Sequence, residues 1–116
     1  MNITDQLLTE LQEFLQKASL ETYAGGGSRE EQPERLGHTE LVFDEGLWKY
    51  RDSYSGYFQS WGQEILSYDG SVLWTQIYGG GMNKEFHGDG EFTNRTFEFL
   101  KKVMRTKETL FQPRGP

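Results

Sequence analysis

The stretch SYDGSVLWTQIY, residues 67–78, decides the fold predicted for this chain. Its dipeptide Asp69-Gly70 favours a type I′ turn, in which both central residues need a positive φ. Strand-like runs stand on either side of the dipeptide: YFQSWGQEILSY (57–68) and SVLWTQIY (71–78). So tight a turn makes the two runs antiparallel neighbours. Gly62 interrupts the first run and predicts a bend or a bulge there.

Two further strands are predicted upstream of this hairpin. They are TELVF (39–43) and LWKYRDSY (47–54), and the turn signal Asp44-Glu45-Gly46 lies between them. Ser55-Gly56 provides the turn into the run that begins at residue 57. Because each connection is short, consecutive strands pair with each other, and the sequence predicts a four-stranded antiparallel meander.

A helix is predicted on each side of the meander. Residues 3–18 repeat apolar side chains at helical spacing after a cap at Asn2 or Thr4, and residues 93–105 do so after a cap at Thr93 or Asn94. We therefore expect one α+β domain, 1–116, with both helices on one face of the sheet. The other face is left to solvent, a ligand or a partner. We expect the loops 24–38 and 79–92 to be flexible.

Composition and charge narrow the function classes. Only 34% of the residues are hydrophobic but 15% are aromatic, and cysteine is absent, which excludes disulfides and thiolate sites. No apolar run approaches the roughly 20 residues of a membrane span, and no signal peptide is recognisable. These features predict a cytoplasmic protein that does not enter a membrane.

The net charge of −6 is concentrated in the first part of the chain. Residues 1–45 hold ten acids and three bases, a net −7, whereas residues 46–116 hold eight acids and nine bases, a net +1. This distribution disfavours direct nucleic-acid binding. It also suggests a hypothesis of its own, an inhibitor of phage or plasmid type whose acids imitate nucleic-acid phosphates.

Two glycine clusters, TYAGGGSRE (22–30) and IYGGGMNKEFHGDGEF (77–92), resemble ligand loops. Neither contains the Gly-Lys pair of a P-loop, and an antiparallel sheet cannot supply the βαβ crossover of a dinucleotide site. Relief of backbone crowding where a strand ends is the favoured role of the second cluster, with an anion-binding nest as the alternative. With two histidines, His38 and His87, the sequence predicts no metal and no cofactor.

Two strand carboxylates, Asp52 and Glu64, are the candidates for acid–base chemistry. Neighbouring strands can bring them together, which would push their pKa values apart. The alternative is that each is a solvent-facing carboxylate bonded to a nearby arginine or tyrosine.

Aromatic side chains accompany these acids on alternate strand positions. In the second strand, residues 48, 50, 52 and 54 share one face, and in the fourth strand Trp74 and Tyr78 share a face with Val72 and Gln76. Leu73 and Ile77 are expected in the core. An aromatic sheet face of this kind is suited to holding a ligand.

Four segments, FLQKASLETYAGGGSREEQPERLGH, GLWKYRDSY, GQEILSYDGSVLWTQIYGGG and FLKKVM…PRGP, together resemble a bacterial family of small domains of unknown function. Its members are found alone or C-terminal to Xre-type helix-turn-helix regulators. The sequence departs from the family motif at Gln63, where the family has a glutamate, and has a longer stretch before the last helix. The resemblance implies a shared fold and polar face at Tyr23, Gly25, Gly26, Arg35, His38, Gly46, Tyr50, Asp52, Gly62, Glu64, Trp74, Tyr78 and Gly80.

The predicted function is a non-catalytic ligand-sensing or protein-interaction module of bacterial or phage origin, binding a small polar ligand or a protein segment on the aromatic and acidic sheet face that the helices leave open. A small acid–base enzyme using Asp52 and Glu64 is the alternative. Unpaired edge strands also allow a dimer. The predicted ligand-binding residues are Tyr23, Gly26, Arg35, His38, Tyr50, Asp52, Glu64, Trp74, Tyr78 and Gly80.

A spatial prediction joins the two glycine clusters. If the first helix packs across the sheet, its C-terminal exit falls near a strand end. We therefore expect residues 23–27 and 78–81 to lie close together, with His38 facing the same cleft.

Overall fold

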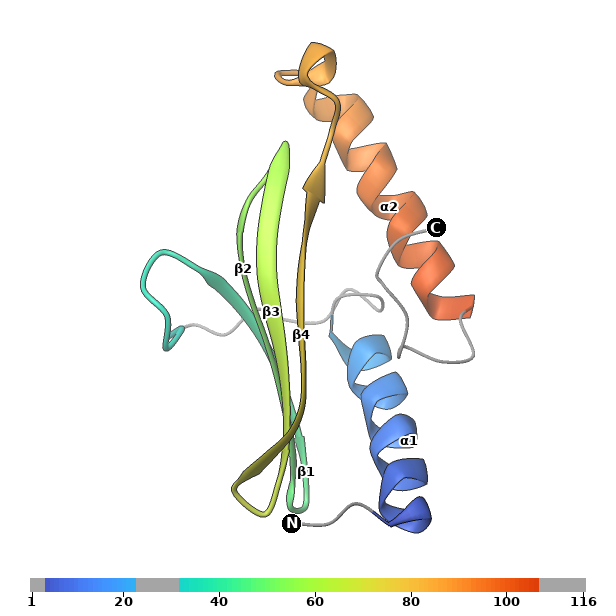
Figure 1. Ribbon diagram of the computed structural model, residues 1–116. Coiled ribbons are helices and arrows are strands. Elements are labelled where there is room, and N and C mark those ends of the chain that lie inside the picture. Colours follow the sequence, from blue (N-terminus) through green and yellow to red (C-terminus); the bar gives the residue numbers. More distant parts are fainter. Residues whose placement is uncertain (1–3, 23–31, 107–116) are drawn as a thin grey trace.

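The computed structural model describes residues 4–22 and 32–106 of the chain. A helix, four strands, a short 3₁₀ turn and a second helix follow one another (Figure 1). The architecture is α+β, with one open antiparallel sheet and both helices on the same side of it. The elements are α1 (Asp5–Glu21), β1 (Thr39–Glu45), β2 (Trp48–Gly56), β3 (Gln59–Tyr68), β4 (Ser71–Gly81), η1 (Lys84–Phe86) and α2 (Gly90–Thr106).

The sheet has the order β1-β2-β3-β4, so every strand pairs with its neighbour in sequence. The β3–β4 turn has the predicted geometry, since Asp69 and Gly70 have φ values of 49° and 80°. The predicted irregularity at Gly62 is misplaced, because the register shift lies between Leu66 and Ser67. Because of this bulge, Val72 does not share a face with Trp74 as predicted. It pairs with Ser67, on the opposite face of the sheet.

Local hydrogen bonds set where the helices begin. The Thr4 hydroxyl accepts from the backbone N–H of Leu7 at 3.1 Å, which caps α1. The second helix begins earlier than predicted, because the Asp89 carboxylate accepts from the backbone N–H of Phe92 at 3.0 Å. The predicted loop 79–92 is also shorter: β4 continues to Gly81, and η1 and the start of α2 occupy much of the rest.

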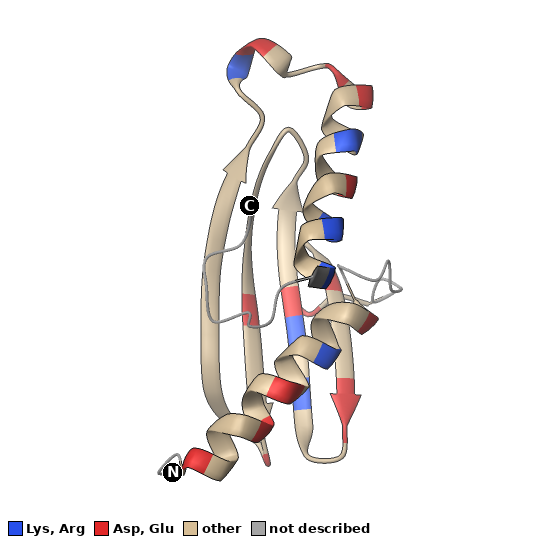
Figure 2. Cartoon of the chain, turned by 90° about the vertical axis from the view of Figure 1, so that its right-hand side faces the viewer, with Lys and Arg blue, Asp and Glu red and all other residues tan. Residues whose placement is uncertain are grey.

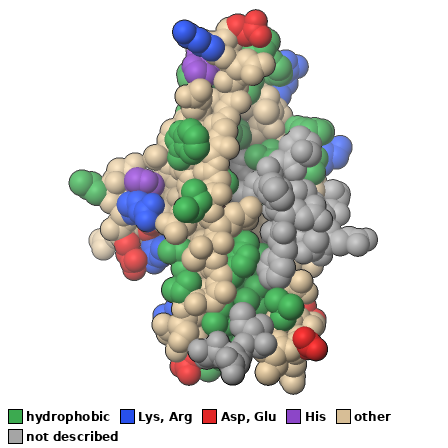
Figure 3. All heavy atoms as spheres, in the orientation of Figure 1, with side chains coloured by type: hydrophobic (Ala, Val, Ile, Leu, Met, Phe, Trp, Pro, Cys, Tyr) green, Lys and Arg blue, Asp and Glu red, His purple; other side chains and the backbone are tan. Residues whose placement is uncertain are grey.

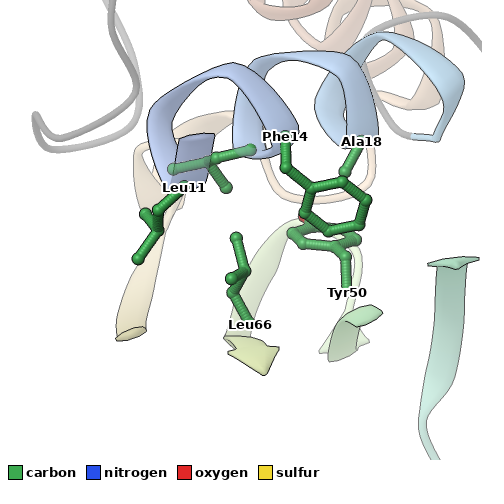
Figure 4. Packing of buried hydrophobic residues seen from close by; sticks show 6 residues of the cluster. Leu11, Phe14, Ala18, Tyr50 and Leu66 are labelled. Carbon is green, nitrogen blue, oxygen red and sulfur yellow. The ribbon is translucent and has the colours of Figure 1, made fainter. Parts of the chain in front are cut away.

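The core lies between α1 and the middle of the sheet (Figure 4). Leu11, Phe14 and Ala18 of α1 point at Tyr50 of β2 and Leu66 of β3. The Phe14 ring stacks on two partly buried rings at the sheet surface, with centroid distances of 5.7 Å to Phe43 and 5.4 Å to Trp48.

The aromatic face of the sheet is therefore the one that the helices cover, and the prediction that it is left open is wrong. Burying several large rings removes more apolar area from water than burying the opposite face, whose strand residues include one ring, Trp61, among mostly smaller or polar side chains. Ile77, expected in the core, is 78% exposed on the uncovered face, whereas Leu73 and Trp74 pack partly buried against the core.

Both helices lie on the same side of the sheet, α1 obliquely across its lower part and α2 above it (Figure 2). Within residues 4–22 and 32–106, neither helix is long and apolar enough to cross a membrane.

Candidate functional site

A groove separates α2 from the upper part of the helix-covered face. It has a volume of about 900 Å³ and is lined by the start of β1 and the neighbouring ends of β2, β3 and β4 on one side and by α2 on the other, with the end of α1 close by. The described lining residues are Thr22, Thr39, Leu41, Tyr54, Gly56, Tyr57, Phe58, Ser60, Tyr78, Gly79, Gly80, Gly81, Met82, Thr93, Asn94, Thr96, Phe97, Glu98, Leu100 and Lys101.

Tyr57, in the turn between β2 and β3, holds α2 at this distance from the sheet. Its hydroxyl bonds the Asn94 side chain and donates to the Gly90 carbonyl oxygen at 3.2 Å, and its ring lies 5.6 Å from that of Phe97. These contacts support the N-terminal half of α2 from the β2–β3 end of the sheet and leave the space between α2 and the strands open.

The link from β4 to α2 is fastened at the top of the groove. The Phe58 and His87 rings stack with centroids 5.8 Å apart, and His87 Nε2 lies 3.0 Å from the Met82 carbonyl oxygen. The backbone N–H of Met82 donates to the carbonyl oxygen of Phe58 at 2.7 Å. The groove therefore has a fixed upper end.

The glycines at the strand ends make room for rings on both faces of the sheet. Gly62 and Tyr78 are cross-strand partners, as are Trp61 and Gly79. A Cβ on Gly62 would lie 2.3 Å from the Tyr78 hydroxyl, and one on Gly79 would lie 1.9 Å from the Trp61 ring. Each glycine thus lets the partner's ring lie flat across the neighbouring strand.

Gly80 differs from these glycines. Among residues 4–22 and 32–106, nothing lies within 4 Å of a Cβ built on it, and Gly80 lines the groove. The space in front of Gly80 belongs to the groove, so the residue is not required by the packing of the fold.

A buried acid pair lies next to the groove. Asp52 and Glu64 are directly opposed cross-strand partners, 0% and 5% exposed. The Tyr78 hydroxyl donates to Asp52 at 2.6 Å, and the Tyr50 hydroxyl donates to Glu64 at 3.0 Å. Tyr78 also lines the groove, so this residue connects the groove to the acid pair.

The uncovered face carries a different polar cluster, centred on Glu40, which is 1% exposed. Its carboxylate accepts from Ser53, from Arg51 and from the backbone N–H of Glu34, the last at 2.7 Å. Burial alone would raise the pKa of Glu40, but these hydrogen bonds and the charge of Arg51 together hold that pKa below its ordinary value of 4.5.

The same cluster fastens the segment 32–38 to the sheet. Arg35 donates to the Gln63 side chain at 3.2 Å, and a second ion pair joins Arg51 to Glu34 at 3.3 Å. Arg51 therefore holds both the strand carboxylate and the segment above it. The ion pairs of Arg51, together with that between Lys17 and Glu45, set two positive charges beside three of the acids of residues 1–45, which makes these acids less suited to imitating nucleic-acid phosphates.

The predicted ligand-binding residues do not form one site. Tyr78 and Gly80 line the groove, Asp52 and Glu64 form the buried acid pair, and Tyr50 and Trp74 belong to the core or pack against it. Arg35 belongs to the uncovered face. Tyr23 and Gly26, with the first glycine cluster, lie outside the described residues, although Thr22 at the end of α1 does line the groove.

His38 does not face the groove, contrary to the prediction. Its Nδ1 lies 3.0 Å from the Leu36 carbonyl oxygen. Strand alternation explains the error, because the next residue, Thr39, is the one that turns toward the groove.

Several groove residues were missed by sequence reasoning, notably Tyr57, Phe58, Met82 and Phe97. The apolar stripe of the second helix is a signal for Phe97 alone, and it indicates a helix face but not what that face contacts. Within the described parts of the chain, no three His, Asp or Glu side chains gather closely enough to hold a metal ion.

A scan against protein-family models and searches of curated proteins and of solved structures find no match to this chain. The resemblance to the bacterial family therefore stays a prediction, and the groove with the side chains around it is the main indication of function.

Proposed function

We propose that the protein is a non-catalytic binding module whose groove holds a small, uncharged polar ligand with an apolar ring or chain. The observation that carries this proposal is the groove itself, about 900 Å³ in volume and walled by the sheet and α2. Small-molecule sites in proteins measure roughly 300–1,000 Å³ and combine apolar walls with a few fixed polar groups.

The lining chemistry supports an uncharged ligand. Apolar walls come from side chains such as Phe58, Phe97 and Leu100, while tyrosine, serine and threonine hydroxyls offer hydrogen bonds. Among the described lining residues the charged side chains are Glu98 and Lys101, which pair with each other at 3.6 Å. A ligand with a net charge would find no excess of opposite charge on these walls.

Thermal-shift screening of neutral amino-acid derivatives, nucleosides, sugars, phenols and short peptides tests this proposal. Binding that favours the folded state raises the melting temperature. Gly80→Val places a side chain in the groove where it contacts none of the described residues. The variant should therefore melt at the wild-type temperature, and the compounds that stabilise the wild type should no longer raise its melting temperature.

Thr75→Val is the matched control, because it introduces the same side chain on the same strand at an exposed position facing away from the helices. It should keep the response. Hits that Gly80→Val still binds, or no hits across the library, would contradict a ligand in the groove.

The second candidate function is acid–base catalysis, favoured by the opposed and buried pair Asp52 and Glu64. In this version Tyr78 would pass a proton between the groove and Asp52, since the residue lines the groove and its hydroxyl donates to Asp52. The test is whether any compound that binds is also converted. Turnover by the wild type that Asp52→Asn abolishes while binding persists would replace the non-catalytic proposal.

A further inference from the structure

The C-terminal end of α2 lies at the lower end of the groove. Leu100 and Lys101 of α2 line the groove together with Thr22, which follows α1. The helix then ends at Thr106, and this end lies near the C-terminal end of α1 (Figures 1 and 2). The chain that follows Thr106 therefore starts beside the groove.

The apolar stripe of α2 runs from the groove to this end of the helix. Phe97 and Leu100 line the groove, and Met104 continues the stripe at helical spacing. Met104 is 5% exposed, although it is not a member of the core cluster that α1 forms with the sheet. The end of α2 thus has an apolar, covered surface of its own that leads into the groove.

The segment after α2 has the chemistry proposed for the ligand. Ten residues, KETLFQPRGP (107–116), follow Thr106 and lie outside the described residues. The middle of this segment, TLFQP (109–113), is uncharged and joins the apolar pair Leu110 and Phe111 to neighbouring polar side chains. It is a neutral stretch that combines an apolar chain, an apolar ring and hydrogen-bonding groups.

The segment is long enough to reach the groove. Leu100 lies six residues before Thr106 and Phe97 lies nine residues before it, which is about 9 Å and about 14 Å along the helix axis. Four extended residues span about 13 Å and five span about 17 Å. A chain that turns back along α2 therefore brings Leu110 and Phe111 to the level of these two groove residues.

Charge draws the segment back towards the rest of the protein. Residues 107–116 hold Lys107 and Arg114 against Glu108, a net +1. The net charge of the whole chain is −6, so the other residues have a net charge of −7. Opposite net charges of the two parts favour their association.

The other apolar surface suits this segment less well. The uncovered face of β3 and β4 exposes hydrophobic side chains (Figure 3), and Trp61 and Ile77 on it are 64% and 78% exposed. On that face, however, Arg35 donates to the Gln63 side chain. A segment with a net positive charge would there lie beside a second positive charge.

We infer that residues 109–113 bind in the lower end of the groove, with Leu110 and Phe111 against α2, and compete with the ligand as a tethered segment. The inference rests on the proposed function, because it concerns the same groove. A short tether gives an effective concentration in the millimolar range, so an intrinsic dissociation constant on the order of 1 mM closes the groove about half of the time. The apparent affinity for a free ligand falls in proportion to the open fraction, about twofold in this case.

NMR of the full chain carrying Leu110→Ser together with Phe111→Ser tests the inference. Without any ligand, the amides of residues 93–101 on the groove wall should shift relative to the wild type. Phenol should then bind the variant at least about twofold more tightly. Gly115→Ser together with Pro116→Ser is the matched control, because it makes two changes to serine in the same segment and keeps the apolar pair. It should leave both readings unchanged.

The two readings separate this inference from the proposed function. Groove amides that stay in place in the double variant, that move equally in the control, or that move without any gain in phenol affinity would overturn the inference, while phenol binding would still support the proposed function. Groove amides that move in the double variant alone, in proteins that do not bind phenol, would support the tethered segment and contradict the proposed ligand. Shifts confined to Trp61 and Ile77 would place the segment on the uncovered face and overturn the inference.

Discussion

The two ends of one sheet face are used differently in this molecule. At the lower end, α1 packs directly on the strands and buries Leu11, Phe14 and Leu15 against Tyr50 and Leu66. At the upper end, α2 stands away from the same strands and encloses a groove of about 900 Å³. The same alternation of residues thus produces core at one end and a candidate site at the other.

The difference lies in what each helix rests on. The lower ends of the strands carry large side chains that pack against α1. The upper ends of β3 and β4 carry several glycines, which leave space between the strands and α2. Tyr57 then holds α2 at the distance that keeps the space open. Stability and the candidate site are therefore placed in separate parts of one face, and substitutions at the two ends should have separable effects.

The largest expected effect is at the packed end. Leu11→Ala removes a side chain that is 1% exposed and should lower the free energy of unfolding by about 2–5 kcal/mol. Leu100→Ala, on the groove wall, should cost less than about 1 kcal/mol because the position is only half-buried and opens onto space. Urea unfolding of both variants measures the contrast, and equal losses would break the comparison.

A smaller effect is expected where the two ends meet. Gly62→Ala should cost about 1–3 kcal/mol, because its Cβ displaces the Tyr78 hydroxyl from Asp52. Gly79→Ala is the matched control on the opposite face. It should cost less than about 0.5 kcal/mol, since the Trp61 ring is exposed and can swing into solvent. If the control proves the more harmful of the two, the assignment of the glycines to their rings is wrong.

The pH dependence of stability tests the buried Glu40 cluster on the uncovered face. The pKa of Glu40 is lowered in the folded state, so its ionised form stabilises the fold. That contribution is present above the ordinary value of 4.5 and is lost as the pH falls through the lower folded pKa. Glu40→Gln should be less stable than the wild type at pH 6, and the gap should narrow below pH 4.5. A gap that stays constant from pH 6 to about pH 3 would contradict the sign of the shift.

The smallest effect is expected at the ion pair between Lys17 and Glu45. Both side chains are about half exposed, 53% and 52%, so water and salt screen the pair. Lys17→Ala should change the free energy of unfolding by about 0.2–1 kcal/mol, and 0.5 M salt should remove most of the difference. A loss of unfolding free energy that exceeds this range and persists in salt would contradict the screened pair and show that this ion pair helps to hold α1 on the sheet.

Most of the fold could be predicted because its signals are local. Asp69-Gly70 fixes the hairpin, period-two runs give the strands, and Thr4 starts α1. The predicted start of the second helix, residue 93, lies three residues after the observed start at Gly90. The difference arises because Asp89, which caps this helix, has no distinctive signal in the sequence. The bulge beside Leu66 was missed because it arises from pairing between strands, and it reversed the expected position of Val72.

The candidate site was predicted only in part, and for a physical reason. Alternation shows that Asp52 and Glu64 occupy mid-strand positions, but which face is buried depends on the total ring area that the helices must cover. The helices bury Tyr50 and partly bury Trp74, and Ile77 stays exposed. The groove itself exists because α2 is held away from the strands. That spacing depends on a contact between Tyr57 and Gly90, which are more than 30 residues apart in the sequence.

An amide NMR titration with phenol, a small neutral ring with one hydroxyl, tests the central claim most directly. At millimolar phenol we expect shifts of the amides of residues 79–82 and 93–101, which line the groove, and no comparable change along α1. Gly80→Val should abolish these shifts with little other change in the spectrum. Shifts confined to Trp61 and Ile77 on the uncovered face, or shifts that Gly80→Val leaves unchanged, would contradict the claim that the upper end of the covered face is the binding site.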